Sequence, residues 1–433
     1  MKMKVLKFGG TSVGSPERMR QVADLLENPG RKLVVLSAMA GTTDELVRIT
    51  HLEATAQVQA LNKLQKDYEA RAKSLIVSGS LQAELINELK LIFSRLYAYL
   101  ETESENSDYE ILALGELLST QMFFYLLKSR RLAVKWLDAR EILLLNEQER
   151  PDEAIIKRRL NAAINNEKVD VFVIQGFISK NWKGRTYNLK RGGSDYSASI
   201  FGKALQAEEI QIWTDIDGMH NGDPRFVENT RPIAKLSFDE AAELAYFGAK
   251  ILHPASIQPA KEANIPVRLK NTLQPQKRGT IISSESDSIS KIKSIAAKDN
   301  ITAIKIKSAR MLLAFGFIRR VFQVFEDHST AIDLITTSEV AVSTTIDDIS
   351  NLEAIVNDLQ ELGDVEVDRN LTIICIVGNF IAEDKGQAVD VFTALKNIPL
   401  RMISYGGSKH NISILIENQY KKSALQALHE SVF

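Results

Sequence analysis

Near its start the chain reads KVLKFGGTSVG over residues 4–14. Residues 5–8 favour a buried strand, because they are strand-forming and apolar except for Lys7. Gly9 and Gly10 follow and have no side chains, so backbone N–H groups there can approach an anion without a Cβ in the way. This stretch predicts a strand that ends in an anion-binding turn.

A helix start follows the turn. Ser15 suits the N-cap, Pro16 the first helical position and Glu17 the first turn. A glycine turn between a strand and a helix N-terminus is a place to hold phosphate. It is not a Walker A loop, since no Gly-Lys-Ser/Thr closes it, and it is not G-x-G-x-x-G, since Thr11 takes the place of the second glycine. By itself it is compatible with an ordinary strand-to-helix turn, so the rest of the chain has to decide.

Composition narrows the class of protein. A chain of 433 residues corresponds to about two to four domains. With 45% hydrophobic residues, 25% charged residues and a net charge of −1, it is an ordinary globular protein without the basic surface that nucleic acid requires. The single cysteine, Cys375, excludes an intrachain disulfide framework and a cysteine metal site, and we expect it to be a buried structural thiol. No secretory segment or apolar run of roughly 18 residues is evident, so we expect a cytoplasmic protein.

Apolar strands alternate with amphipathic helices in the first part of the chain. Residues 33–36 form a second such strand, which ends in the hydroxyl-rich loop 37–43. This alternation favours a parallel sheet covered on both faces, with active-site loops at the carboxyl ends of its strands. We therefore expect Gly9 and Gly10 to lie beside loop 37–43.

Polar groups recur at the expected helix and loop positions of that sheet. Residues 45–103 predict a helical hairpin, and residues 111–128 predict an apolar helix that carries Glu116, a plausible cation ligand if it faces the cleft. The charged residues at the later loop ends, together with Lys7, are Arg191, Asp195, Asp215, Asp223, Arg225 and Lys250. Many cations with two glycine turns suit a polyphosphate, and phosphoryl transfer needs positioning and charge neutralisation more than a covalent nucleophile.

From about residue 285 the pattern changes. Residues 283–290 are polar and serine-rich. Strands and short helices then alternate in a β-α-β-β-α-β order, with strands expected at 301–306 and 332–338, and the order starts a second time at residue 371. The second cycle lacks its last strand, and we predict that residues 292–298 supply it, because an open sheet edge is a liability. The C-terminal part is expected to form two small α+β modules that share strands.

At these residues the chain resembles the aspartokinases, within the amino-acid-kinase fold, over essentially its whole length. The motifs that carry the resemblance are Lys7-Phe8-Gly9-Gly10-Thr11-Ser12, Arg191-Gly192-Gly193-Ser194-Asp195, Trp213-Thr214-Asp215, Asp223-Pro224-Arg225 and Phe247-Gly248-Ala249-Lys250. The resemblance implies a three-layer α/β/α kinase domain with a mostly parallel sheet over residues 1–284. A linker and strand at 285–298 and two ferredoxin-like ACT modules at 299–368 and 369–433 would follow.

The reaction implied by the resemblance is phosphoryl transfer from ATP, with Mg²⁺, to the side-chain carboxylate of L-aspartate, the first step of lysine, threonine and methionine biosynthesis. Lys7 would neutralise the transferring group and Asp195 would orient Lys7. The residues implied for ATP are Lys7, Gly9, Gly10, Ser12, Thr214, Asp215, His220, Asp223, Arg225 and Lys250. Those implied for aspartate are Ser37, Thr43, Glu116, Arg191, Gly192 and Ser194, with Arg191 on the α-carboxylate and Glu116 on the ammonium group. We expect Mg²⁺ to be bound mainly by the ATP phosphates, with no ligand set of protein side chains.

The first ACT module also matches the lysine-binding pattern of lysine-inhibited family members. The matching residues are Met311, Gly316, Phe317, Ile318, Asp333, Thr337, Ser338 and Glu339, of which Asp333 and Glu339 would meet the effector's ammonium groups. Family members pair through these modules, which implies a homodimer or a dimer of dimers. Three residues depart from the family pattern: His220 where Tyr is usual, Lys190 where Gly is common and Ala314 where Ser is often found.

Two other functions stay open at this point. A kinase of another small acid in the same superfamily, such as glutamate, N-acetylglutamate or UMP, would use the same fold, although the twin ACT modules and the motif at 191–195 speak against it. A non-catalytic amino-acid sensor would need only the ACT pair, and it leaves the complete set of cleft charges unexplained.

Overall fold

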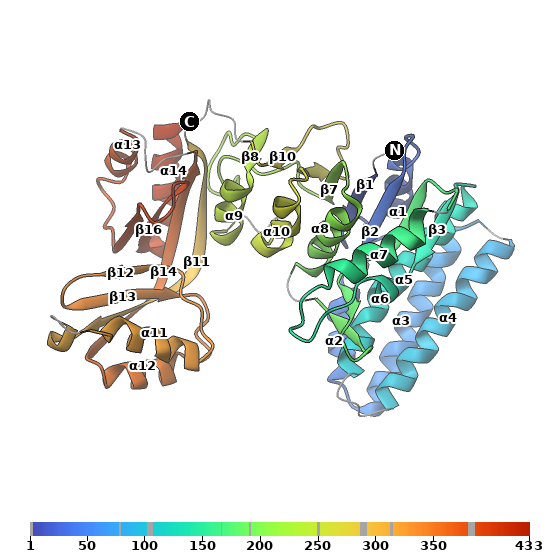
Figure 1. The fold of residues 1–433 in the computed structure, drawn as a ribbon, viewed down its shortest axis with the longest axis horizontal. Helices are drawn as coiled ribbons and strands as arrows, with labels where there is room; N and C mark the ends of the chain where they lie inside the picture. Colours follow the sequence, from blue (N-terminus) through green and yellow to red (C-terminus); the bar gives the residue numbers. More distant parts are fainter. Residues whose placement is uncertain are drawn as a thin grey trace. The chain divides into compact units, whose positions relative to one another are not determined.

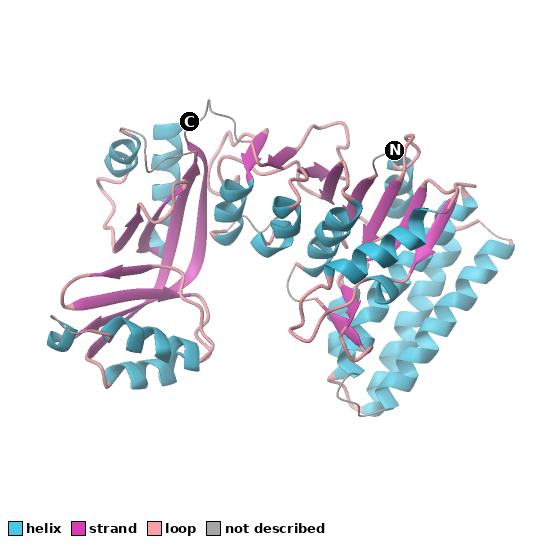
Figure 2. Cartoon of the chain, viewed as in Figure 1, coloured by secondary structure: helices cyan, strands magenta, loops and turns pink. Residues whose placement is uncertain are grey.

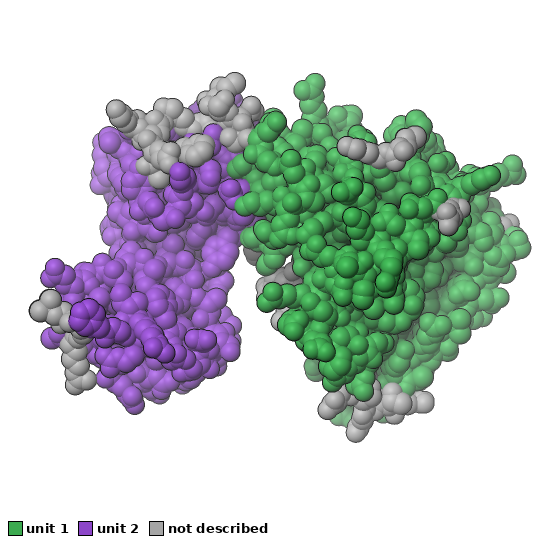
Figure 3. Space-filling model, in the orientation of Figure 1, with its two compact units in different colours: residues 1–219, 234–238, 252–285 green, residues 220–233, 239–251, 286–433 purple. Residues whose placement is uncertain are grey.

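The computed structural model describes residues 3–433 except 78, 102–106, 166, 190–191, 249–251, 286–291, 312–314 and 380–385. Its helices and strands are shown in Figure 1 and Figure 2. The chain divides into two compact units (Figure 3). Unit 1 comprises residues 1–219, 234–238 and 252–285, and unit 2 comprises residues 220–233, 239–251 and 286–433.

Unit 1 is built on an eight-stranded sheet. In sheet order its strands are β3 (Val134–Leu137), β4 (Val171–Gln175), β2 (Lys32–Leu36), β1 (Lys4–Phe8), β7 (Glu209–Thr214), β9 (Val267–Asn271), β10 (Thr280–Ser283) and β8 (Lys235–Ser237). Neighbouring strands run parallel except for the antiparallel pair β9 and β10. A separate hairpin is formed by β5 (Ile178–Lys180) and β6 (Thr186–Asn188). The strand predicted from residues 5–8 is thus central, with Lys7 opposite Val35 and Ile212.

Helices cover both faces of this sheet (Figure 1). On one face α8 (Gly193–Leu205) packs on β1, β2 and β7, beside α7 (Glu153–Asn165) and α10 (Pro254–Glu262). The other face carries α5 (Ser107–Ser129) and α1 (Pro16–Leu25). The remaining helices of unit 1 are α2 (Thr42–Thr50), α3 (Ala54–Leu75), α4 (Ser80–Glu101) and α6 (Ala139–Ile142). The predicted three-layer α/β/α class is confirmed.

Two helix starts follow directly from local sequence. Ser15 is the N-cap of α1, where its hydroxyl accepts a hydrogen bond from the Arg18 N–H at 3.3 Å, as the sequence predicts. His253 is the N-cap of α10, and its Nδ1 accepts from the Ala255 N–H at 3.3 Å. The imidazole of His253 therefore caps the N-terminus of α10.

Helix α5 is the core helix of unit 1. Residues Asp108–Ser129 are long and apolar enough to cross a membrane by length and composition, and no other helix among the described residues is. The sequence shows no uninterrupted apolar run here, because polar residues such as Glu110 and Glu116 divide it. Inside the fold, 78% of the relevant window is buried, as expected for a helix packed against a sheet.

Unit 2 contains one six-stranded antiparallel sheet. In sheet order its strands are β12 (Ile335–Thr337), β13 (Ala341–Ile346), β11 (Ile292–Lys307), β14 (Asp364–Gly378), β16 (Asn411–Glu417) and β15 (Met402–Tyr405). Residues 292–298 and 301–306, expected as separate strands, are joined in β11 across a bulge. The first half of β11 pairs with the second half of β14, with Ile295 opposite Ile376. The two α+β modules therefore share both long strands.

Helices and apolar clusters complete unit 2. Its helical segments are α9 (Phe238–Tyr246, whose first residue belongs to unit 1), η1 (Ala309–Met311), α11 (Phe317–Asp327), α12 (Leu352–Gln360), α13 (Gln387–Ala394), η2 (Asn418–Tyr420) and α14 (Lys421–Val432). One cluster centres on Phe317 and Phe325, and the other on Ile376 and Leu425. Val227 belongs to segment 220–233, which is part of unit 2 although the residues on either side of it belong to unit 1. Its side chain packs in the second cluster. The domain boundaries expected at 284, 298 and 368 stay predictions.

The strand expected at residues 332–338 is shorter than the sequence suggests. The ladder with β13 begins at Ile335, opposite Thr344. Before it, Asp333 makes one backbone bond, from its N–H to the Thr345 carbonyl at 2.8 Å, while its carboxylate takes side-chain partners. The next backbone N–H, that of Leu334, donates to the Thr345 hydroxyl at 2.9 Å. A side-chain bond to the backbone of this kind competes with regular strand pairing.

Candidate active site

Lys7 and Asp195 are brought together at the carboxyl end of β1. Lys7 shares the face of Val5, which approaches α8. Its Nζ lies 2.7 Å from Oδ1 of Asp195, which is in the first turn of α8. The two groups form an ion pair, although their angles do not meet the criteria for a hydrogen bond. The two side chains are only 12% and 14% exposed. An ammonium group is thereby held at the predicted glycine turn with little competition from water.

The glycine turn packs tightly against the loop that follows β2. The Ala40 N–H donates to the Gly10 carbonyl at 3.1 Å, and the Ser37 N–H donates to the Phe8 carbonyl at 3.2 Å. A Cβ on Gly10 would lie 2.8 Å from the Ala38 carbonyl oxygen, closer than real Cβ atoms come. The predicted proximity of the two loops is confirmed, and Gly10 is the residue that allows it.

Glu116 is buried in α5 with only 4% of its surface exposed. Its Oε1 accepts a hydrogen bond from the Ala38 N–H at 3.1 Å, whereas Oε2 is buried without a partner among the described residues. Burial raises the pKa of Glu116 to about 8, although the Ala38 N–H acts to lower it. Because a buried carboxyl oxygen is normally paired, Oε2 is a candidate acceptor for a cationic or donating ligand.

The turn before α8 carries the next expected aspartate-binding residues. Gly192 has a φ of +77°, and a Cβ there would lie 2.6 Å from the Ser256 hydroxyl, so only glycine fits. Ser194 lies against Gly176 at the end of β4, where a Cβ would come 2.6 Å from Ser194 Cβ. Residues 190–191, which include the expected substrate guanidinium, lie outside the described residues.

Two hydroxyl pairs were not found from the sequence. The Tyr68 hydroxyl hydrogen-bonds Thr42 Oγ1 at 2.7 Å, next to the expected Thr43, and burial raises the pKa of Tyr68 to about 12. The Ser12 hydroxyl, expected at the nucleotide, hydrogen-bonds Thr272 Oγ1 at 2.8 Å. Tyr68 lies in the helical hairpin, whose periodicity shows only a core face, so the sequence carries no signal for its role.

Of the remaining nucleotide candidates, two belong to unit 1. Thr214 is the last residue of β7 and Asp215 follows it, and the Thr214 hydroxyl donates to Asp215 Oδ1 at 2.9 Å. The Asp215 backbone carbonyl accepts from the Asn271 side-chain amide at 3.2 Å. Both residues therefore sit at the same sheet edge as Lys7.

The other described nucleotide candidates belong to unit 2. The Arg225 guanidinium donates three hydrogen bonds to Asp223, from Nε to Oδ1 at 3.0 Å and to Oδ2 at 3.1 Å and from a terminal nitrogen to Oδ2 at 2.6 Å. Burial acts to raise the pKa of Asp223, but the bonds from Arg225 outweigh it and lower that pKa. His220 Nδ1 lies 3.1 Å from the Thr230 hydroxyl. Lys250 lies outside the described residues.

The expected effector residues divide by exposure. Phe317 is buried in the core of the first module, and Gly316 is the N-cap of α11 with a φ of +80°. Ile318 is 39% exposed. Three residues, Thr337, Ser338 and Glu339, are exposed at the turn between β12 and β13, and Met311 packs at the core edge. The side chain of Asp333 is only 2% exposed, and Ala314 lies outside the described residues.

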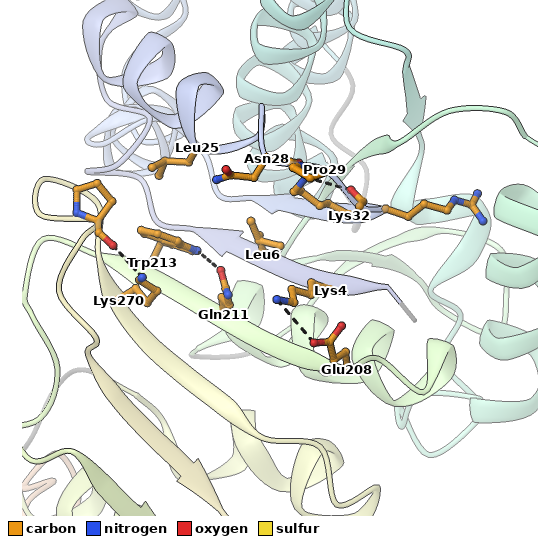
Figure 4. A pocket seen from close by; sticks show the side chains of 13 residues that line it. Lys4, Leu6, Leu25, Asn28, Pro29, Lys32, Glu208, Gln211, Trp213 and Lys270 are labelled. Carbon is orange, nitrogen blue, oxygen red and sulfur yellow. Dashed lines mark hydrogen bonds and ion pairs between the residues drawn. The ribbon is translucent and has the colours of Figure 1, made fainter. Parts of the chain in front are cut away.

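A hollow of about 430 Å³ lies on the opposite face of β1 and β7 (Figure 4). Lys4 and Leu6 line it, because alternate strand residues point to opposite faces. Trp213 Nε1 donates to Gln211 Oε1 at 3.0 Å, and Lys270 Nζ lies 4.9 Å from the Trp213 ring centre. This hollow does not share the face of Lys7.

Fold and site together define a member of the amino acid kinase family, whose model matches residues 2–271, and the ACT domain model matches residues 374–432. The chain is 34% identical over 446 residues to lysine-sensitive aspartokinase 3 of Escherichia coli (strain K12), with 99% of each chain covered. It is similar to the crystal structure of E. coli aspartokinase III in complex with aspartate and ADP, with a TM-score of 0.86, 32% identity and 100% of both chains covered. The corresponding complex with lysine and aspartate has a TM-score of 0.84 at the same identity and coverage. The chain belongs to the aspartokinase family.

Proposed function

We propose that the protein is an ATP-dependent aspartate kinase that forms 4-phospho-L-aspartate and ADP, the first step of lysine, threonine and methionine biosynthesis. The observation that carries this proposal is the ammonium group of Lys7, held 2.7 Å from Asp195 at the glycine turn of the central strand. Similarity over the whole chain to aspartokinases, one of which was crystallised with aspartate and ADP, supports it.

In the proposed reaction an oxygen of the aspartate side chain attacks the γ-phosphorus of ATP. The new O–P bond forms as the bond from that phosphorus to the β–γ bridging oxygen breaks, and ADP leaves with the bridging oxygen. Lys7 neutralises charge on the transferring group, Asp195 holds Lys7 in place, and the N–H groups of Gly9 and Gly10 add further donors. No general base is needed, because a carboxylate is already ionised near pH 7.

The proposed aspartate site uses the loops beside Lys7. Glu116 receives the substrate ammonium at its unpartnered Oε2, which is the strongest argument for its assignment. Arg191 is proposed for the α-carboxylate, since a guanidinium can bind it through two hydrogen bonds. Further contacts are proposed for Ser37, Thr43, Gly192 and Ser194.

The proposed nucleotide residues are Lys7, Gly9, Gly10, Ser12, Thr214, Asp215, His220, Asp223, Arg225 and Lys250. Among the described residues there is no group of three or more His, Cys, Asp or Glu side chains placed to hold a metal ion. We propose that Mg²⁺ is bound mainly by the ATP phosphates, where it offsets negative charge during transfer.

Lysine is the proposed feedback inhibitor, acting through Asp333, Glu339 and the other residues of the first module. Its support is the lysine-sensitive E. coli relative and the E. coli structure with lysine and aspartate. A cytoplasmic location and a homodimer or dimer of dimers are proposed as well.

Exposed apolar residues on the first module favour the proposed dimer. Phe315 is fully exposed, and Ile318, Phe322 and Val340 are 39%, 40% and 49% exposed. Light scattering on the Phe322→Glu variant should give a lower mass than the native chain. An unchanged mass would assign the dimer contact elsewhere.

The direct test is ADP release with aspartate, glutamate, N-acetylglutamate or UMP as acceptor. Aspartate alone should support turnover, and Lys7→Ala should lower kcat about 100- to 1000-fold, as expected for one electrostatic group at a transition state. Lys4→Ala is the matched control, because Lys4 lies on the same strand but faces the hollow of Figure 4. Turnover with another acceptor and none with aspartate would refute the function, and a loss below about tenfold in Lys7→Ala would refute the role of Lys7.

A further inference from the structure

Helix α9 lies in the part of the chain that matches the amino acid kinase family. Its side chains nevertheless contact the six-stranded sheet of unit 2. Residues at three-residue spacing share one helix face. Along that face, Glu240 pairs with Lys293 of β11 at 3.1 Å, and the Asn411 side chain donates to Glu243. The helix follows β8 of the kinase sheet with no residue between them. Any change in how α9 docks is therefore passed on covalently to a strand of unit 1.

Tyr246 makes the third contact of this face. Its hydroxyl donates to Oδ1 of Asp333 at 2.7 Å, and Asp333 is the residue proposed to meet the effector's ammonium group. The same Oδ1 accepts a bond from Lys298 Nζ at 2.6 Å, and that ammonium lies 4.6 Å from the centre of the Tyr246 ring. One carboxylate oxygen thus joins the last turn of α9 to β11 and to the proposed effector site.

The second oxygen of the same carboxylate is available. Asp333 Oδ2 is buried and has no partner among the described residues, and the side chain is only 2% exposed. A buried carboxylate oxygen in this state accepts a donor that reaches it. Since Lys298 already neutralises Asp333, an effector ammonium at Oδ2 would place two like charges on one carboxylate.

Lys298 has a second carboxylate partner, toward which its ammonium group can move. Its Nζ lies 2.9 Å from Oδ2 of Asp347, a side chain that is 45% exposed. Moving toward Asp347 relieves the like-charge contact and changes the environment of Oδ1, the atom to which the Tyr246 hydroxyl is bonded. The bond between Tyr246 and Asp333 therefore has a different strength with and without effector, which is what coupling requires.

We propose that Tyr246 is the coupling residue through which effector binding at Asp333 is transmitted to α9 and from there to the kinase sheet. This inference rests on the proposed lysine inhibition. Tyr246 acts through Asp333 and α9, and it is not among the residues assigned to ATP or aspartate.

The test measures binding to the full-length chain by isothermal titration calorimetry. The dissociation constant of ADP is determined with and without saturating L-lysine, and the ratio of the two constants is the coupling factor. In Tyr246→Phe the ring over Lys298 remains and only the hydroxyl is lost. We expect the affinity for lysine to be kept or slightly increased, and the coupling factor to fall about tenfold toward one, as for loss of one hydrogen bond to a charged group.

Two further variants make the result specific. Tyr187→Phe removes a hydroxyl that donates to the carboxylate of Glu149 at 2.8 Å in unit 1, and it should leave the coupling factor unchanged. Asp333→Asn should lose lysine binding itself. An unchanged coupling factor in Tyr246→Phe would overturn the inference. Absence of lysine binding to the native chain would overturn both the effector assignment and the inference, whereas aspartate-dependent ADP release is scored separately and tests the kinase function alone.

Discussion

The unpartnered carboxyl group of Glu116 predicts that aspartate binding releases a proton. Burial raises the pKa of Glu116 from 4.5 to about 8, so the group is mainly protonated at pH 7 before substrate binds. Ionising it there costs about 5 kcal/mol more than in water, from about 1.36 kcal/mol for each tenfold change in acidity. An ammonium group about 3 Å from Oε2 recovers a similar amount at an effective dielectric constant of about 20. The substrate therefore binds the ionised form.

The magnitude is set by the proton that must leave. With a pKa near 8, about nine-tenths of the free enzyme carries this proton at pH 7, so about 0.9 proton should be released for each aspartate bound. Below pH 8 the dissociation constant for aspartate should fall about tenfold for each pH unit of increase. Calorimetry in two buffers of different ionisation enthalpy measures the released proton directly.

Glu116→Gln is the variant that isolates the charge. Its side-chain carbonyl can still accept the bond from Ala38, but it has no proton to release. We expect aspartate affinity to fall about 100-fold, since a buried charge-assisted contact is lost, and the pH dependence between pH 6 and 8 to disappear. If the native chain releases no more protons than the variant, or if both bind aspartate equally, the assignment of Glu116 to the substrate ammonium is wrong.

The same group predicts a stability difference with a defined sign. Because the pKa is raised on folding, the folded chain keeps its proton between about pH 4.5 and pH 8 while the unfolded chain has lost it. Stability of the native chain should therefore fall as pH rises through this window, by at most about 5 kcal/mol. Glu116→Gln should melt at a higher temperature than the native chain at pH 8 without substrate, and equal melting temperatures there would contradict the raised pKa.

Three further predictions follow from single contacts. Gly10→Ala should destabilise unit 1 by about 1–3 kcal/mol in urea unfolding, because its Cβ position is 2.8 Å from a backbone oxygen; a stability equal to the native one would show that the loop relaxes freely. Lys293→Met should cost about 3–5 kcal/mol by leaving one member of a buried ion pair, and adding Glu240→Leu should restore much of the loss; a double variant no better than the single one would contradict the pairing. Tyr68→Phe should raise the KM for aspartate a few-fold with little change in kcat, because it frees the Thr42 hydroxyl beside the substrate loop; an unchanged KM would make Tyr68 a packing residue only.

The sequence by itself determined the local secondary structure and the types of ionisable and polar residue available for a site. Apolar periodicity located the central strand and the helices, and Ser15 marked the start of α1. These features depend on residues a few positions apart, so they can be read from the chain directly. The repeat of α+β elements after residue 285 could be read for the same reason.

The sequence could not show how the long strands join. Residues 292–298 and 301–306 are a single bulged strand, because both segments pair with β14, which is itself continuous. Strand pairing depends on partners distant along the chain, which local patterns do not encode. The shortening of the strand before Ile335 has the same origin, since the Leu334 N–H is bonded to the side-chain hydroxyl of Thr345 on the facing strand.

The candidate site shows the same division. The residue types at the glycine turn pointed to phosphoryl transfer, but the sequence did not show which residues would contact them. Helix α8 packs on the parallel strands β1 and β7, and this packing places Asp195 next to Lys7. Only the tertiary structure buries Glu116 with one oxygen unpaired, and it is burial that moves the pKa. A sequence lists the ionisable groups, whereas their distances and dielectric surroundings exist only in the folded chain.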